Sequence, residues 1–304
     1  MANTPRHKAS DFDPEVLRLF DQYVHGAIDR RGFLAGAARF AVGAAGAAGL
    51  LAALSPQFAA AQQIKPDDKR LTAKYIEFPS PQGYGTARGY LVRPVQAKGP
   101  LATVLVVHEN RGLNPHIEDV TRRLALEGYI AFAPDALFPL GGYPGDEDKA
   151  RAEFAKLDQA KTRQDFIAAA KMLHGIEGGS GRLGVVGFCY GGGMSNFLAT
   201  QLPELDAAAP FYGPAPAVED VPKIKAQMLV VLAANDERVN ATWPGYEAAL
   251  KQAGVRYELY QPANTQHGFN NDTTPRYDEA AAKEAWTKTL ALFDRALRKG
   301  GREA

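Results

Sequence analysis

The sequence contains one cysteine, Cys189, and its neighbours are those of a nucleophile turn. It stands in Gly187-Phe188-Cys189-Tyr190-Gly191, which is followed by two more glycines and a helical pattern. A reactive residue on a sharp strand-to-helix turn needs glycine beside it, because a Cβ there would strike neighbouring backbone. The following helix N-terminus stabilises a thiolate. The pattern predicts a nucleophilic thiol, although a buried cysteine is more commonly an inert apolar residue.

Two later segments could supply the acid and the base that such a thiol needs. Asp236 follows the apolar run Met228–Ala233, and His267 follows Tyr257–Tyr260. An imidazole would hold the proton, and a carboxylate would fix its tautomer and orientation. Each residue alone has an ordinary explanation, as a helix cap or a satisfied polar group. Their order, nucleophile then acid then base at successive strand ends, is that of α/β-hydrolases and predicts a Cys–His–Asp triad.

Strand-like and helix-like segments alternate from residue 71 onwards, and these elements must position the triad. The expected strands are Tyr75–Phe78, Ala87–Arg93, Ala102–His108, Tyr129–Ala133, Leu183–Phe188, Ala207–Tyr212, Met228–Ala233 and Tyr257–Tyr260. The expected helices are Ile117–Glu127, Lys149–Leu157, Arg163–Leu173, Gly191–Leu202, Pro244–Ala253 and Glu279–Lys299. The alternation predicts a mostly parallel, doubly wound α/β sheet with helices on both faces, in one domain over residues 62–304. Ligands of such sheets bind at the carboxyl ends of the strands.

From about Tyr75 to Leu297 the sequence resembles the dienelactone hydrolase (carboxymethylenebutenolidase) family, which has the α/β-hydrolase fold. The resemblance rests on Val-Val-His-Glu-Asn-Arg-Gly-Leu-Asn at 106–114, the turn at Cys189, Asp236, and His-Gly-Phe at 267–269. It implies a hydrolase of carboxylic esters or lactones that forms a thioester on Cys189. It further implies that Glu109 contacts the resting thiol; alternatively, Glu109 is a loop carboxylate that caps the helix Ile117–Glu127. The backbone amides of Tyr190 and Asn110 are the expected oxyanion donors.

The substrate side of the site is less clearly marked in the sequence. Dienelactone-cleaving members of the family carry an arginine shortly after the catalytic histidine, and here the nearest is Arg276. Arg151 is a weak match to a second substrate-binding arginine. Both arginines could equally be solvated surface charges. The stretch Ala136–Asp146 is a candidate lid, and the candidate pocket walls are Phe138, Tyr143, Tyr212, Trp243 and Phe269.

Residues 1–61 have the features of a leader rather than of the domain. Arg30-Arg31 precede the uncharged run Phe40–Leu54, and Ala59-Ala60-Ala61 follow. This resembles a twin-arginine export signal and predicts cleavage after Ala61, passage through the twin-arginine translocation machinery, and a periplasmic or secreted protein. The run is short for a membrane span, so we expect none in the mature chain. The alternative is a cytoplasmic protein that keeps this segment, because Phe12–Ile28 has near-helical spacing of apolar residues.

The composition excludes several other classes of protein. With 35 basic and 34 acidic residues the net charge is +1, so nothing attracts nucleic acid. A single cysteine cannot form an intrachain disulfide or a zinc site of several thiolates. The histidines after residue 61 form no HExxH pattern, and no cofactor-binding fingerprint is present, so the expected partner is a small-molecule ester or lactone. A non-catalytic binding protein with this fold, and a cysteine acyltransferase or peptidase on the same scaffold, remain the alternatives.

Overall fold

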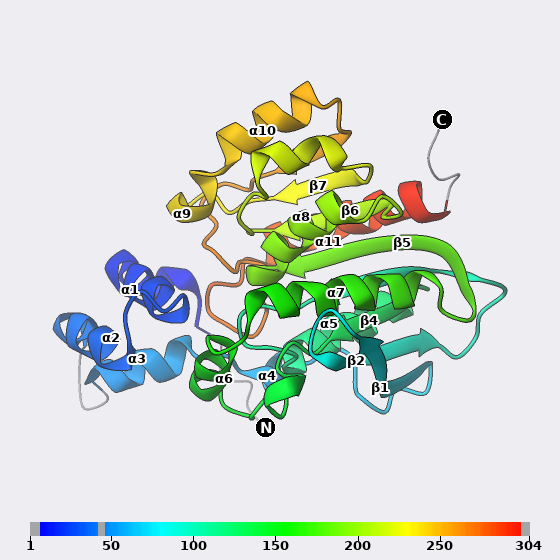
Figure 1. The fold of residues 1–304 in the computed structure, drawn as a ribbon. Helices are drawn as coiled ribbons and strands as arrows, with labels where there is room; N and C mark the ends of the chain where they lie inside the picture. Colours follow the sequence, from blue (N-terminus) through cyan, green and yellow to red (C-terminus); the bar gives the residue numbers. More distant parts are fainter. Residues whose placement is uncertain (1–6, 42–45, 299–304) are drawn as a thin grey trace.

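An eight-stranded sheet forms the centre of the protein (Figure 1). The structure is a computed structural model, and it describes residues 7–41 and 46–298. The strands are β1 (Leu71–Ser80), β2 (Gly85–Pro94), β3 (Leu101–Val107), β4 (Ile130–Pro134), β5 (Gly179–Phe188), β6 (Ala207–Phe211), β7 (Gln227–Val231) and β8 (Tyr257–Tyr260). Their order across the sheet is β1-β2-β4-β3-β5-β6-β7-β8. This is the doubly wound arrangement predicted from the sequence.

The sheet is antiparallel at one edge and parallel elsewhere. β1 pairs with β2 and β2 with β4 in antiparallel fashion. The remaining neighbours, from β4 through β3 to β8, are parallel. The β-branched run in β3 is buried at all but its first residue, as expected for a strand covered on both faces. Parallel strands end at the same edge, so the residues that follow β3, β5, β7 and β8 meet there.

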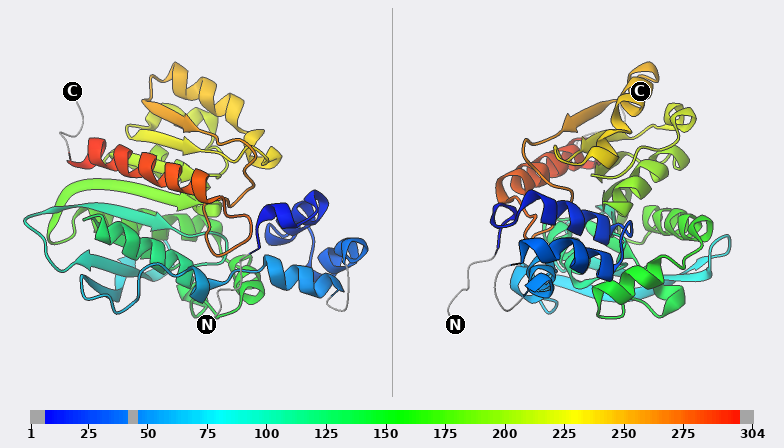
Figure 2. Two further views of the ribbon diagram at one scale, coloured as in Figure 1. Left: turned by 180° about the vertical axis from the view of Figure 1, so that it is seen from behind. Right: turned by 90° about the vertical axis from the view of Figure 1, so that its left-hand side faces the viewer.

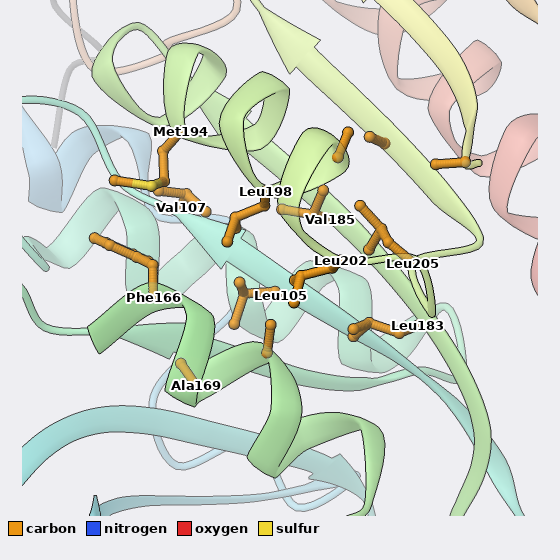
Figure 3. Close-up of a cluster of buried hydrophobic side chains, with 14 of the residues drawn as sticks. Leu105, Val107, Phe166, Ala169, Leu183, Val185, Met194, Leu198, Leu202 and Leu205 are labelled. Carbon is orange, nitrogen blue, oxygen red and sulfur yellow. The ribbon is translucent and has the colours of Figure 1, made fainter. Parts of the chain in front are cut away.

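Helices cover both faces of the sheet and form two apolar clusters with it. The helices are α5 (Pro115–Leu126), α6 (Glu147–Phe154), α7 (Gln159–His174), α8 (Tyr190–Gln201), α9 (Glu237–Asn240), α10 (Trp243–Gln252) and α11 (Glu279–Phe293). Residues of α6, α7, α8 and α10 pack on one face, where Phe166 and Leu198 meet Leu105 and Val185 (Figure 3). Residues of α5 and α11 pack on the other. The two clusters hold the sheet rigid from either side.

The predicted elements are all present, with differences at their ends. β5 begins at Gly179 rather than Leu183, because Gly179 pairs with Leu101 although its neighbours show no apolar pattern. The last helix ends at Phe293 and continues as a π-helical turn, Asp294–Arg298; Lys299 lies outside the described residues. The stretch Ala136–Asp146 contains a short 3-10 turn, Phe138–Leu140.

The N-terminal residues form a separate group of helices. These are α1 (Pro14–Val24), α2 (Arg30–Ala37) and α3 (Gly46–Leu54), which we call the helical cap; a short helix α4 (Phe58–Ala61) follows. Asp13 caps α1 by accepting from the Glu15 amide, and Pro14 occupies its first turn. The helical spacing seen within Phe12–Ile28 is thereby confirmed. Part of the apolar run Phe40–Leu54, residues 42–45, lies outside the described residues.

The cap lies beside the sheet edge at which the parallel strands end. Figures 1 and 2 show its helices grouped together on that side of the molecule, away from α10 and the C-terminal helix. Its core is its own: Val16, Phe20, Phe33, Leu51 and Leu54 are buried against one another. Of the helices described, none has the length and apolarity needed to cross a membrane.

Candidate active site

The turn that carries Cys189 connects β5 to α8. Cys189 has φ 56° and ψ −112°, a backbone conformation that non-glycine residues rarely adopt. A Cβ on Gly187 would lie 2.1 Å from the Gly191 carbonyl oxygen, and one on Gly191 would lie 2.2 Å from that of Val107. Glycine is therefore required on both sides of the thiol. The Cys189 amide donates to the Phe211 carbonyl at 3.0 Å, which ties the turn to β6.

Asp236 and His267 come together as predicted. His267 Nδ1 lies 2.5 Å from Asp236 Oδ2, and both side chains are buried. Asp236 also caps α9 by accepting from the Val239 amide at 3.2 Å. The loops that carry the two residues are linked by a β-bridge between Asn235 and Gln266. The carboxylate thus orients the imidazole while its own position is fixed by backbone.

The imidazole and the thiol form a coupled pair. Cys189 Sγ and a ring nitrogen of His267 lie within 4.8 Å of each other. Burial alone would raise the pKa of Cys189, but the charge of His267 and hydrogen bonds from His25 and His267 lower it to about 5. Burial would lower the pKa of His267, yet the Cys189 thiolate and Asp236 raise it. The arrangement favours a thiolate beside an imidazolium, which is an activated nucleophile.

Glu109 lines the same cavity as Cys189 and His267. It follows β3, and its Oε2 accepts a hydrogen bond from Asn271 Nδ2 at 3.0 Å. The contact with the resting thiol that the resemblance implies stays a prediction. Glu109 does not cap the next helix, because Asn114 accepts from the Ile117 amide and caps α5. No sequence pattern indicates the hydrogen bond between Glu109 and Asn271, because the two residues are 162 positions apart.

The expected oxyanion donors belong to two segments: Tyr190 follows Cys189 in the chain, and Asn110 lines the cavity that contains Cys189. Tyr190 is the first residue of α8, where backbone amides have no partner within the helix. Asn110 follows Glu109 at the end of β3, and its side chain donates to the Val24 carbonyl at 3.0 Å. The Asn110 side chain therefore has a role in holding the helical cap that the sequence did not indicate.

A second histidine, from the N-terminal helices, also contacts the thiol. His25, the residue after α1, places Nε2 3.5 Å from Cys189 Sγ and 3.2 Å from His267 Nε2. Its Nδ1 lies 3.2 Å from Asp21 Oδ1 and 2.8 Å from the Asp21 carbonyl oxygen. His25 was passed over because residues 1–61 were assigned to a leader. Spacing offers no signal for a contact across 164 residues.

Cys189, His25 and His267 have donor atoms that a divalent metal could use. These atoms lie within 4.8 Å of one another, and each imidazole has a carboxylate on its other nitrogen, as metal-binding histidines commonly do. However, Arg238 Nη2 lies 3.2 Å from His25 Nε2. A guanidinium at that distance repels a cation, so the cluster is better explained as a hydrogen-bonded group around the thiolate.

A family model described as "Dienelactone hydrolase family" matches residues 87–297. The chain belongs to this family. It is a hydrolase of the carboxylic ester class, as the sequence predicted, and its sheet has the α/β-hydrolase fold. A second model, described as "YqhI-like", matches residues 3–42, which contain α1, α2 and the turn at Ala38–Phe40. The cap and the hydrolase region are thus recognised separately.

Relatives and solved structures agree with this assignment. An Escherichia coli (strain K12) protein named "Putative carboxymethylenebutenolidase" is 31% identical over 245 residues, covering 76% of this chain and 89% of the relative. Another from the same organism, "Putative hydrolase fragment YghX", is 56% identical over 98 residues, covering 32% of this chain and 84% of the relative. A crystal structure titled as a putative dienelactone hydrolase from Klebsiella pneumoniae superposes with a TM-score of 0.65 at 30% identity, covering 74% and 99% of the two chains.

A cavity of about 370 Å³ opens at Cys189 and His267. Of the predicted substrate contacts, Arg276 and Tyr143 line it. Arg276 lies nine positions after His267 in sequence but folds back beside it: its Nη2 would be 3.2 Å from a Cβ on Gly268. The structure therefore places an arginine beside His267, as expected for this family, although Arg276 comes later in the sequence than the expected position. Of the two aromatic residues in the candidate lid, Phe138 and Tyr143, only Tyr143 lines the cavity.

The other predicted contacts lie outside the cavity lining. Tyr212 and Phe269 are fully buried and pack behind His267, with the Tyr212 and His267 ring centroids 5.0 Å apart. Phe138 lies against the Arg88 guanidinium, and Trp243 packs on Tyr246 and Tyr257. Arg151 contacts the Tyr23 ring and carbonyl instead of the cavity. For Phe138 and Trp243 this corrects the expectation, because their rings pack on other side chains instead of facing the cavity.

Proposed function

We propose that Cys189, His267 and Asp236 act as a catalytic triad that hydrolyses a carboxylic ester or lactone. The observation that carries this proposal is the thiol held at a positive-φ turn beside an imidazole whose other nitrogen is bound to a buried carboxylate. Such a group supplies the nucleophile, the proton acceptor and the orienting anion that acyl transfer requires.

The reaction proceeds in two halves. The Cys189 thiolate attacks the ester carbonyl carbon, and the carbonyl electrons move onto oxygen, where the amides of Tyr190 and Asn110 stabilise the charge. The tetrahedral species collapses to a thioester, and the departing alkoxide takes the proton of the His267 imidazolium. Neutral His267 then removes a proton from water, which attacks the thioester. The carboxylic acid leaves and the thiolate–imidazolium pair is restored.

Arg276 is the candidate anchor for a charged substrate. Its Nε and Nη1 atoms are buried without a hydrogen-bond partner among the described residues, and the side chain faces the cavity. A buried guanidinium without full hydrogen bonding favours an anion. We therefore propose a substrate that carries a carboxylate near the scissile carbonyl, so that the arginine fixes the orientation of the ester.

The test compares Cys189→Ala and Cys189→Ser with the wild type on an aryl acetate and on a dienelactone. Both substitutions are expected to abolish turnover, since a hydroxyl is far less acidic than a thiol and is not ionised by this imidazole. Turnover that persists in Cys189→Ala rejects the mechanism. Turnover of neither substrate by the wild type or by Asp21→Ala/His25→Ala, with intact folding, favours a binding protein; acyl transfer to an added amine or thiol in preference to water favours an acyltransferase.

We also propose that the chain is exported through the twin-arginine machinery with cleavage after Ala61. The support is the Arg30-Arg31 pair followed by an apolar, uncharged run and small residues at the cleavage position. N-terminal sequencing of the protein isolated from fractionated cells tests this. A periplasmic chain that begins at Gln62 is expected, and an intact N-terminus in the cytoplasm contradicts it.

A further inference from the structure

We infer that the helical cap is an intramolecular inhibitor, in which His25 and Asp21 occupy the places of the substrate's reacting group and of its carboxylate. The inference rests on the proposed function, because it takes Cys189 and His267 as the reacting groups and Arg276 as the anchor. It concerns the regulation of that site by the helical cap, and the cap lies outside the residues 87–297 that the family model matches.

His25 blocks the approach to the thiol. A reacting carbonyl carbon must come within about 3–3.5 Å of the nucleophile. His25 Nε2 already lies 3.5 Å from Cys189 Sγ and 3.2 Å from His267 Nε2, and the two imidazole rings stand at 86° with centroids 4.5 Å apart. The sulfur and the general acid therefore face His25 instead of a substrate, and Cys189 is only 9% exposed.

Asp21 lies at the same end of α1 and faces the anchor. Its Oδ1 is 3.7 Å from Arg276 Nη1, and the Arg276 guanidinium also lies over the Phe20 ring, 5.2 Å from its centroid. Asp21 and His25 are one helical turn apart, so the carboxylate of Asp21 lies at Arg276 while the imidazole of His25 lies at Cys189. This spacing reproduces the two contacts that we propose for a carboxylated ester.

Side chains of the hydrolase region hold α1 in this position by its C-terminal end. The Val24 carbonyl accepts from Asn110 Nδ2 at 3.0 Å and from Arg111 Nη1 and Nη2 at 3.3 Å each. The Tyr23 carbonyl accepts from Arg151. The last carbonyls of a helix have no partner within it and carry the negative end of its dipole, so two arginines are suited to bind them.

The cap is attached in a way that permits release. Its buried apolar residues form a cluster of their own, and the two clusters of the hydrolase region contain none of them. The joint near the thiol is made of polar contacts, which water can replace at little cost. Removal of residues 1–61, as proposed for export, would delete His25 and Asp21 and leave the cavity open. Activity would then appear only after export.

The test measures access to the thiol separately from catalysis in the full-length chain. Cys189 is the one cysteine, so alkylation by iodoacetamide, followed by intact mass, reports this site alone. At about pH 9, above the ordinary cysteine pKa, the thiolate fraction does not limit the rate. We expect Asp21→Ala/His25→Ala to raise the alkylation rate at least about tenfold over wild type, and to raise aryl-ester turnover several-fold.

The cap itself supplies a matched control. His7 and Asp11 form a second histidine–aspartate pair at the same four-residue spacing, but they are 56% and 49% exposed and contact only their own segment. His7→Ala/Asp11→Ala is expected to leave both rates at the wild-type value. Phe33→Ala, which removes a fully buried ring from the cap core without touching the cavity, is expected to raise both.

The outcomes separate the two proposals. Faster alkylation with no ester turnover in any variant supports the inhibitor and rejects the proposed function. Unchanged alkylation in Asp21→Ala/His25→Ala and in Phe33→Ala, with a normal thermal transition, overturns the inhibitor. Faster alkylation together with slower turnover also overturns it, since His25 would then be part of the working site.

Discussion

Two histidine–aspartate pairs meet at Cys189, one from the hydrolase region and one from the helical cap. His267 and Asp236 are 2.5 Å apart with side chains only 6% and 3% exposed. His25 and Asp21 are 3.2 Å apart at 16% and 36% exposure. The second pair is partly buried at the cavity and belongs to the cap. We propose that the same two residue types form a catalytic element in one region and a releasable contact in the other.

The difference between the regions lies in what surrounds each pair. The loop of Asp236 follows β7, which is buried between the two layers of helices, and a β-bridge joins it to the loop of His267, which follows the edge strand β8. The cap has one small core and is bound near the site by side chains on its backbone carbonyls. A rigid scaffold positions chemistry, whereas a small helical unit with a polar joint is suited to leave.

The largest contrast is expected between Asp236→Asn and Asp21→Asn. The first removes the anion that fixes the His267 tautomer, so kcat on an aryl ester should fall by roughly 10²–10⁴, the scale seen when a triad aspartate is replaced by asparagine. The second should leave kcat at or above the wild-type value, since Asp21 belongs to the cap. Steady-state kinetics measure both. Equal losses would show that the two pairs have equivalent roles.

Glycine substitutions should separate the regions by stability. Gly191→Ala places a Cβ 2.2 Å from the Val107 carbonyl oxygen, and we expect it to destabilise the hydrolase region by more than about 4 kcal/mol. Gly26→Ala meets no atom within 4 Å but has φ +80°, so a cost of about 1 kcal/mol is expected. Urea denaturation monitored by circular dichroism measures the two. A mild effect at Gly191 would contradict the close approach of α8 to β3.

Aromatic truncation tests whether the two cores are independent. Phe166→Ala in the hydrolase core should cost about 3–5 kcal/mol in the main unfolding transition. Phe33→Ala should leave that transition nearly unchanged and instead abolish amide-exchange protection in α1 and α2. Thermal melts and hydrogen exchange on the full-length chain provide the readouts. A large shift of the main transition in Phe33→Ala would show that the cap and the sheet fold as one unit.

The smallest expected effect is on the titration of the thiol. The pKa of Cys189 is about 5, so the thiolate fraction should rise as the pH rises through that value and be nearly complete at neutral pH. His25 contributes a hydrogen bond that lowers this pKa. His25→Ala should therefore move the midpoint upward. Ultraviolet absorbance of the thiolate against pH measures it, and a midpoint that stays in place would show that His267 alone sets the ionisation.

Much of the hydrolase region could be predicted from local sequence. Apolar runs such as Ala102–His108 mark buried strands, and the glycines around Cys189 mark a turn that admits no side chain. The ends of elements were less predictable, because Gly179 joins β5 only through its pairing with Leu101. The fold of Arg276 back to Gly268 likewise depends on a loop whose path no periodicity records.

The sequence by itself determined the fold class, and it predicted the three residues that we propose as a triad. Apolar strand runs and the glycine-rich turn are local patterns, and the order of Cys189, Asp236 and His267 along the chain can be read without the structure. The tertiary structure alone decided that Glu109 bonds to Asn271, that Arg276 stands beside His267, and that His25 faces the thiol. Each of these contacts joins segments far apart in the chain. Their geometry follows from how the sheet, its loops and the cap pack, which no local pattern specifies.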